Sequence, residues 1–160
     1  MKKQKKTFRE KLREDKGLPR IVNVPKEMDG KWGVREGDTM LIPAPVEVDA
    51  VMKSVPEGKL ITIDQIRETL ARKHGTTISC PLTTGIFASI AAHAAEEEKA
   101  DGKKEITPYW RTLRKGGELN EKYPGGAEAQ KKLLENEGHT VVKKGRKFFV
   151  QDYEKKLVKL

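Results

Sequence analysis

Residues 62–99, TIDQIRETLARKHGTTISCPLTTGIFASIAAHAAEEEK, carry the signals for two helices joined by a short turn. Thr62 and Gln65 form a capping box, and apolar side chains follow at helical spacing. Gly75 is expected to end the first helix, and Pro81 to lie in the first turn of the second. This is the helix-turn-helix pattern, whose second helix enters the major groove of DNA, although many helical pairs in enzymes look the same.

The segments around this pair predict an α/β fold that is mainly helical. Residues 17–45 are rich in glycine and proline, and their short apolar pieces read as extended. Residues 125–138, GGAEAQKKLLENEG, predict an amphipathic helix, and residues 140–150, TVVKKGRKFFV, predict two strands around a basic loop. A basic hairpin after a helix-turn-helix is typical of a wing.

The positive charge lies at the two ends of the chain. The net charge is +9, with nine Lys and Arg against three acids in residues 1–20 and seven against two in residues 139–160. Basic arms suit a polyanion, because each cation near a phosphate releases condensed counterions. The alternative is that these ends are solvated tails.

We expect a cytoplasmic, nucleoid-associated monomer with no membrane segment. The first twenty residues lack the apolar stretch of a signal peptide, and the longest apolar run is too short to span a bilayer. The single cysteine, Cys80, cannot form an internal disulfide.

Few residues offer catalytic chemistry. Ser79 or Cys80 is the expected cap of the second helix, where the helix dipole favours a thiolate, although most lone cysteines are small buried apolar residues. His93 lies about 20 Å from Cys80 along the same helix, so the two cannot form a catalytic dyad. The histidines and cysteine lack metal-ligand spacing, so we expect no metal and no cofactor. The acids Glu96–Glu98 are expected to form a solvated helix end.

Three segments together resemble one known family. They are VDAVMKSVPEGKLITIDQI at 48–66, GIFASIAAHAA at 85–95 and YPGGAEAQKKLLENEGH at 123–139. In this order they are similar to the O6-alkylguanine-DNA alkyltransferases and the related alkyltransferase-like proteins, over about residues 46–142. The resemblance implies a winged helix-turn-helix DNA-binding domain like the alkyltransferase C-terminal domain.

The reactive motif of that family is altered. Where the family has Pro-Cys-His-Arg, this chain has Pro108, Tyr109, Trp110 and Arg111. Tyr109 takes the place of the nucleophile, and Glu137 matches the glutamate that orients the missing histidine. A phenol without an adjacent base is a poor alkyl acceptor, so alkyl transfer at this place is not expected.

The family's apparatus for base extrusion is also altered. Its phosphate-rotating tyrosine falls at Ile63, its intercalating arginine has no counterpart, and its asparagine-bearing hinge is replaced by residues 96–105. Tyr109 and Trp110 either stack an extruded base or fill and close the vacated pocket.

These observations predict four parts of the chain. Residues 1–16 form a basic arm, residues 17–45 a lead-in, residues 46–152 the alkyltransferase-like domain, and residues 153–160 a basic tail.

We expect a non-enzymatic protein that binds double-stranded DNA and recognises O6-alkylguanine, with an excision-repair protein as a partner implied by the resemblance. Tyr109 and Trp110 line the damage pocket, with Arg111 as a structural clamp. The residues expected to meet the groove are Thr83, Thr84 and Ser89, and those expected to meet phosphates are Lys143, Lys144, Arg146 and Lys147. Two alternatives stay open, a DNA methyltransferase that uses Cys80 as a relocated alkyl acceptor and a lesion-independent DNA-binding module.

Overall fold

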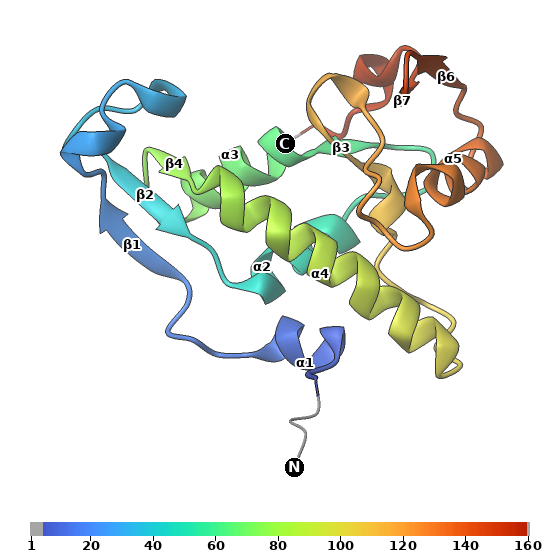
Figure 1. Cartoon of the computed structure of the whole chain (residues 1–160), viewed down its shortest axis with the longest axis horizontal. Helices are drawn as coiled ribbons and strands as arrows, with labels where there is room; N and C mark the ends of the chain where they lie inside the picture. The colour runs from blue at the N-terminus through green and yellow to red at the C-terminus, as the bar shows by residue number, and fades with distance from the viewer. Residues whose placement is uncertain (1–4, 160) are drawn as a thin grey trace.

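A long central helix organises the molecule (Figure 1). The computed structural model describes residues 5–159. Helix α4 (Pro81–Ala100) packs against α1 (Phe8–Arg13), α2 (Pro45–Lys53) and α3 (Ile63–His74). Its buried side chains are mostly alanines, which let the neighbouring helices approach closely and form one core with the valine, methionine and isoleucine side chains of α2 and α3.

The capping signals of the helix pair are confirmed. Thr62 Oγ1 accepts from the Gln65 backbone N–H at 3.2 Å, and Gln65 Oε1 accepts from the Thr62 N–H at 3.1 Å. Gly75 ends α3 with φ +68°, a backbone conformation that glycine adopts without strain. Pro81 is the first residue of α4, as predicted.

The lead-in forms a sheet that is attached to the turn of the helix pair. Strand β1 (Arg20–Asn23) runs antiparallel to β2 (Thr39–Ile42), and β2 runs parallel to β4 (Ile78–Ser79), which lies between α3 and α4. The loop from β1 to β2 contains the short 3-10 helices η1 (Lys26–Met28) and η2 (Lys31–Gly33).

The predicted hairpin follows the predicted helix. Helix α5 (Gly126–Asn136) leads into β6 (Val141–Lys144) and β7 (Lys147–Val150), which pair antiparallel. Near the centre, β3 (Ile61–Thr62) pairs in parallel with β5 (Thr112–Leu113). No helix within residues 5–159 is both long and apolar enough to cross a membrane.

The C-terminal residues, predicted to be a separate basic tail, are instead built into the domain as far as Val158. After η5 (Tyr153–Lys156) the chain runs beside β3: the Leu60 N–H donates to the Lys156 carbonyl at 2.9 Å, and the Val158 N–H donates to the Leu60 carbonyl at 2.8 Å. Leu157 packs into a second core with Leu60. The apolar residues of this segment find partners that lie far away in the sequence.

The N-terminal arm is also docked, over the part that the structure describes. Residues 1–4 of the predicted arm lie outside the described residues, whereas α1 lies along α4. Glu97 accepts the backbone N–H groups of Phe8 and Arg9 at 3.1 and 2.9 Å, and the Arg9 guanidinium lies 3.7 Å from the same carboxylate.

The prediction that Glu96–Glu98 form a solvated helix end is therefore wrong. Glu97 caps α1, Glu98 forms an ion pair with Lys103 at 3.2 Å, and Glu96 accepts from the Tyr109 hydroxyl at 2.7 Å. Consecutive residues of a helix point in different directions, so three neighbouring acids serve three different partners.

Replacing Glu97 with alanine should loosen α1 and lower the stability of the protein. The change removes the acceptor of two α1 N–H groups, so we expect the free energy of unfolding to fall by about 1–2 kcal/mol. Urea unfolding followed by circular dichroism measures this loss. Glu105→Ala, at an exposed position with no described side-chain partner, is the control, and equal stability of the two variants would contradict the capping role.

Candidate nucleic-acid interface

The residue in the place of the family's nucleophile is part of the core. Tyr109 begins the 3-10 turn η3 (Tyr109–Arg111) and is 1% exposed. Its ring packs edge-on against Trp110 and Tyr123, with centroids 5.3 and 5.5 Å away. Burial, together with the bond to Glu96, raises the pKa of Tyr109 well above its usual value. The phenol is therefore neutral and shielded, which excludes it as a nucleophile near neutral pH.

Trp110 and Arg111 share one carboxylate. Trp110 Nε1 donates to Glu137 Oε2 at 2.7 Å, and Arg111 Nε and Nη2 each donate to the same carboxylate at 2.9 Å. Arg111 Nη1 also donates to the Val55 carbonyl at 2.7 Å. Burial raises the pKa of Glu137, but the hydrogen bonds from Arg111 and Trp110 outweigh it and hold the pKa below its usual range. Arg111 thus joins Glu137 to the Val55 carbonyl, which is what a structural clamp does.

Tyr109 and Trp110 fill the place where the sequence resemblance puts a reactive pocket. Pro108 and Tyr109 are buried, and Trp110 is partly buried between the two cores. Of the two alternatives that the sequence left open, the structure supports the one in which the rings close the pocket. The expectation that Tyr109 and Trp110 line an open damage pocket is corrected accordingly.

Two candidates on α4 are buried as well. Thr84 is 0% exposed, and its hydroxyl donates to the Cys80 carbonyl at 2.7 Å, so it cannot meet a groove. Cys80, at the N-cap of α4, is 9% exposed and packs with Val24 and Met40 in a small core that includes residues of the lead-in sheet. The structure therefore agrees with the reading of Cys80 as a small apolar residue and not with that of an accessible acceptor. Thr83 is partly exposed.

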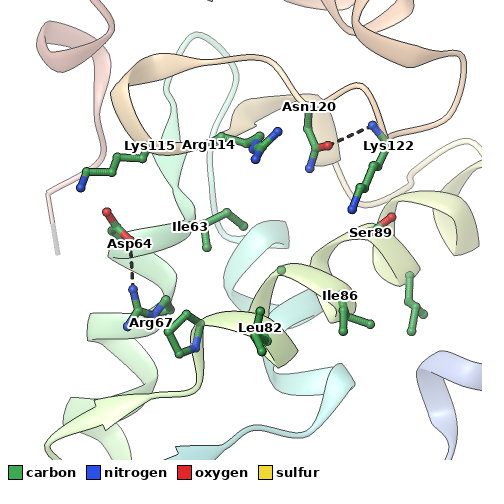
Figure 2. A pocket seen from close by; sticks show the side chains of 13 residues that line it. Ile63, Asp64, Arg67, Leu82, Ile86, Ser89, Arg114, Lys115, Asn120 and Lys122 are labelled. Carbon is green, nitrogen blue, oxygen red and sulfur yellow. Dashed lines mark hydrogen bonds and ion pairs between the residues drawn. The ribbon is translucent and has the colours of Figure 1, made fainter. Parts of the chain in front are cut away.

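A hollow of about 620 Å³ opens beside the exposed side of α4 (Figure 2). The beginning of α3, the first half of α4 and the loop 114–122 enclose it. Of the predicted contact residues, Ser89 lines it. The cations that surround the hollow were not among the predicted contact residues; they are Arg67, Arg114, Lys115 and Lys122.

Two large apolar side chains lie exposed at this hollow. Leu82 is 66% exposed and Ile86 is 56% exposed, one turn apart on α4, and Ile63 of α3 also lines the hollow. Apolar side chains surrounded by cations suit nucleic acid, since the cations reach phosphates and the apolar groups contact sugars and base faces. Two signals in the sequence could have indicated this surface: the cations of the loop 114–122, and the spacing of Leu82 and Ile86 by one helical turn.

The basic hairpin is anchored to the same loop. Lys143, Lys144, Arg146 and Lys147 are all exposed. The Leu119 N–H donates to the Phe148 carbonyl at 3.0 Å, and Lys147 Nζ lies 3.7 Å from Glu118. The hairpin that carries the predicted phosphate-binding residues is therefore hydrogen-bonded to the loop 114–122, which lines the hollow.

Among residues 5–159, no group of three His, Cys, Asp or Glu side chains is arranged to hold a metal ion. His74 Nε2 lies 2.6 Å from Glu47, and His93 Nε2 lies 2.9 Å from the Lys122 carbonyl.

The elements described above define a mainly helical α/β domain in which a helix pair is followed by a basic hairpin. Solved structures share this fold. The crystal structure of S. pombe Atl1 in complex with damaged DNA containing O6-carboxymethylguanine is similar, with a TM-score of 0.50, 18% identity, and coverage of 72% of this chain and 94% of that one. The S. pombe alkyltransferase-like protein in complex with DNA gives a TM-score of 0.52 and 19% identity, with the same coverage.

No protein-family model matches the chain, and no curated protein sequence matches it. The solved structures nevertheless confirm that the chain has the alkyltransferase-like fold that the sequence resemblance implied.

Loss of the Glu137 carboxylate should destabilise the protein strongly. Glu137→Ala leaves the Arg111 guanidinium and the Trp110 N–H without their shared acceptor. The Arg111 side chain is only 14% exposed and Trp110 is partly buried, and breaking a buried ion pair costs about 3–5 kcal/mol. Chemical denaturation provides the measurement. Glu135→Ala, at an exposed position in the last turn of α5, serves as the control, and a similar loss in both variants would contradict the anchoring role.

His139 should make the protein less stable in mild acid. The ring is 7% exposed, its Nε2 has no hydrogen-bond partner among the described residues, and burial lowers its pKa. As the pH falls below about 6.5, histidine in the unfolded chain gains a proton that the folded form resists, so the free energy of unfolding decreases.

The free energy of unfolding measured at pH 7.5 and at pH 5.5 gives the size of this effect. Both pH values lie above the range in which Glu137 titrates. His139→Gln should flatten the dependence over this interval, and an unchanged dependence in that variant would rule out His139 as its source.

Proposed function

We propose that this chain is a non-enzymatic DNA-binding protein that recognises alkylated DNA. The observation that carries the proposal is the hollow beside α4, which combines exposed apolar side chains with surrounding cations. The fold adds support, since similar chains were solved with DNA, one of them with O6-carboxymethylguanine.

General affinity for DNA comes from the cations. Arg114, Lys115 and Lys122 border the hollow, and the hairpin adds exposed cations beyond it. The hairpin serves as the wing of the domain, and α4 serves as the helix that enters a groove. Phosphate contacts of this kind carry no sequence information and weaken as salt is added.

In this proposal the hollow takes over the role that the sequence assigned to the aromatic pair. An alkyl group on O6 of guanine is apolar, and Ile63, Leu82 and Ile86 offer apolar contact. Ser89 and Asn120 offer polar groups to the base edge. A volume of about 620 Å³ is in the range of small-molecule sites and accepts an extruded base.

No alkyl transfer accompanies binding. A transfer needs an accessible nucleophile with an activating base. Tyr109 and Cys80 are 1% and 9% exposed, and Trp110 occupies the position where the family has its activating histidine. We propose that the protein is a monomer in the cytoplasm, associated with the nucleoid. By analogy with the alkyltransferase-like proteins, it hands the lesion to an excision-repair protein.

Fluorescence anisotropy of one duplex, with and without a single O6-methylguanine, tests the proposal at matched near-physiological salt. We expect binding about tenfold tighter to the lesion, which is about 1.4 kcal/mol. The double variant Leu82→Ala, Ile86→Ala should lose this preference and keep the salt-dependent general affinity. Val46→Ala, at a similarly exposed apolar position on α2, is the matched control.

Two outcomes would contradict the proposal. Equal affinity of the native protein for both duplexes would indicate a lesion-independent DNA-binding module. An increase in intact mass after incubation with the methylated duplex, abolished by Cys80→Ser, would indicate an alkyl acceptor.

A further inference from the structure

A second hollow lies beside the first, where the lead-in meets the helix pair. Its volume is about 450 Å³, and Trp32, Glu68 and Ser79 belong to its lining. It shares Asp64, Arg67 and Lys115 with the hollow beside α4. We propose that it is a nucleotide-binding subsite, in which Trp32 stacks on one base of the bound DNA next to the lesion. This inference rests on the proposed function.

Trp32 is held in a conformation that large side chains rarely adopt. Its φ is +52° and its ψ is +25°, in the left-handed region, and 47% of the residue is exposed. The Gly30 N–H donates to the Val34 carbonyl at 2.7 Å, and the Val34 N–H donates to the Lys31 carbonyl at 3.0 Å, which braces the loop around it. Unusual backbone of this kind persists where the surrounding structure fixes it, and it occurs often at binding sites.

A polar group in the lining lacks a partner. Ser79 is 1% exposed, and its Oγ has no hydrogen-bond partner among the described residues. Its carbonyl accepts from Arg67 Nε at 3.1 Å, and Arg67 Nη1 lies 3.2 Å from Asp64. A buried hydroxyl without a partner calls for an explanation, and a bound group that reaches it is one.

The chemistry of the lining matches that of a nucleotide. The exposed indole offers a stacking surface for any base. Arg67 and Lys115 supply positive charge for a phosphate, and the exposed carboxylate of Glu68 accepts from an exocyclic amino group. Because the two hollows share these cations, one DNA strand can occupy both, which favours a nucleotide of the bound strand over a free one.

Stacking on Trp32 should contribute measurably to affinity. Trp32→Ala should weaken binding to the O6-methylguanine duplex by about tenfold, whereas Trp32→Phe keeps a ring and should retain most of the affinity. Trp32→Gly tests the same loss with a residue that adopts positive φ freely, so the loop keeps its shape. Val46→Ala, with 49% exposure against 47% for Trp32, is the control. The salt dependence should stay unchanged in all four variants.

The emission of Trp32 provides a second readout. The chain has two tryptophans, so the difference between the native protein and Trp32→Phe reports Trp32 alone. We expect the duplex to quench this emission and millimolar deoxycytidine monophosphate to leave it nearly unchanged. Equal quenching by the mononucleotide would overturn the assignment to the bound strand.

The two proposals fail in distinguishable ways. If the native protein prefers the lesion duplex but Trp32→Ala and Trp32→Gly bind as tightly as the native protein, the subsite is wrong and the proposed function stands. If the native protein binds neither duplex, both are wrong.

Discussion

The structure depends on one buried carboxylate. Glu137, just after α5, accepts from Trp110 and Arg111, and its Oε1 also accepts from the Gly58 N–H at 3.2 Å. Since Arg111 reaches the Val55 carbonyl as well, a single group joins the last helix, the turn before β3 and the motif before β5. The loop 114–122 begins directly after β5, so the position of the cations beside the hollow follows from this cluster of hydrogen bonds. The position of these surface cations thus depends on a contact between largely buried side chains.

The aromatic residue at the place where the sequence resemblance puts a nucleophile is not available for binding. Tyr109 donates a hydrogen bond to Glu96 on α4 and packs against Trp110 and Tyr123, so its ring is part of the core. A ring that stabilises the core cannot also swing out to meet a base without exposing its apolar neighbours. What remains accessible is the opening between α3, α4 and the loop, where Leu82 and Ile86 stand out from the helix.

Local signals in the sequence predicted local structure well. The capping box at Thr62, the stop at Gly75 and the hairpin at residues 141–150 all depend on residues a few positions apart. The bonds from Phe8 to Glu97 and from Val158 to Leu60 join residues about ninety to a hundred positions apart, and no local pattern encodes such pairs.

The contact face of α4 was missed for a related reason. Its alanines are small and apolar on several sides, so the helical period does not reveal which side is exposed. Thr84 was therefore expected at the groove but is buried, and the exposed Leu82 was not singled out. The sequence of residues 17–45 also carried no signal for its part in this surface. Strand β2 pairs with β4 in the turn of the helix pair, which fixes that turn. The same pairing brings the loop of Trp32 beside Arg67. A segment outside the family resemblance thus both stabilises the helix pair and widens the face that the pair presents.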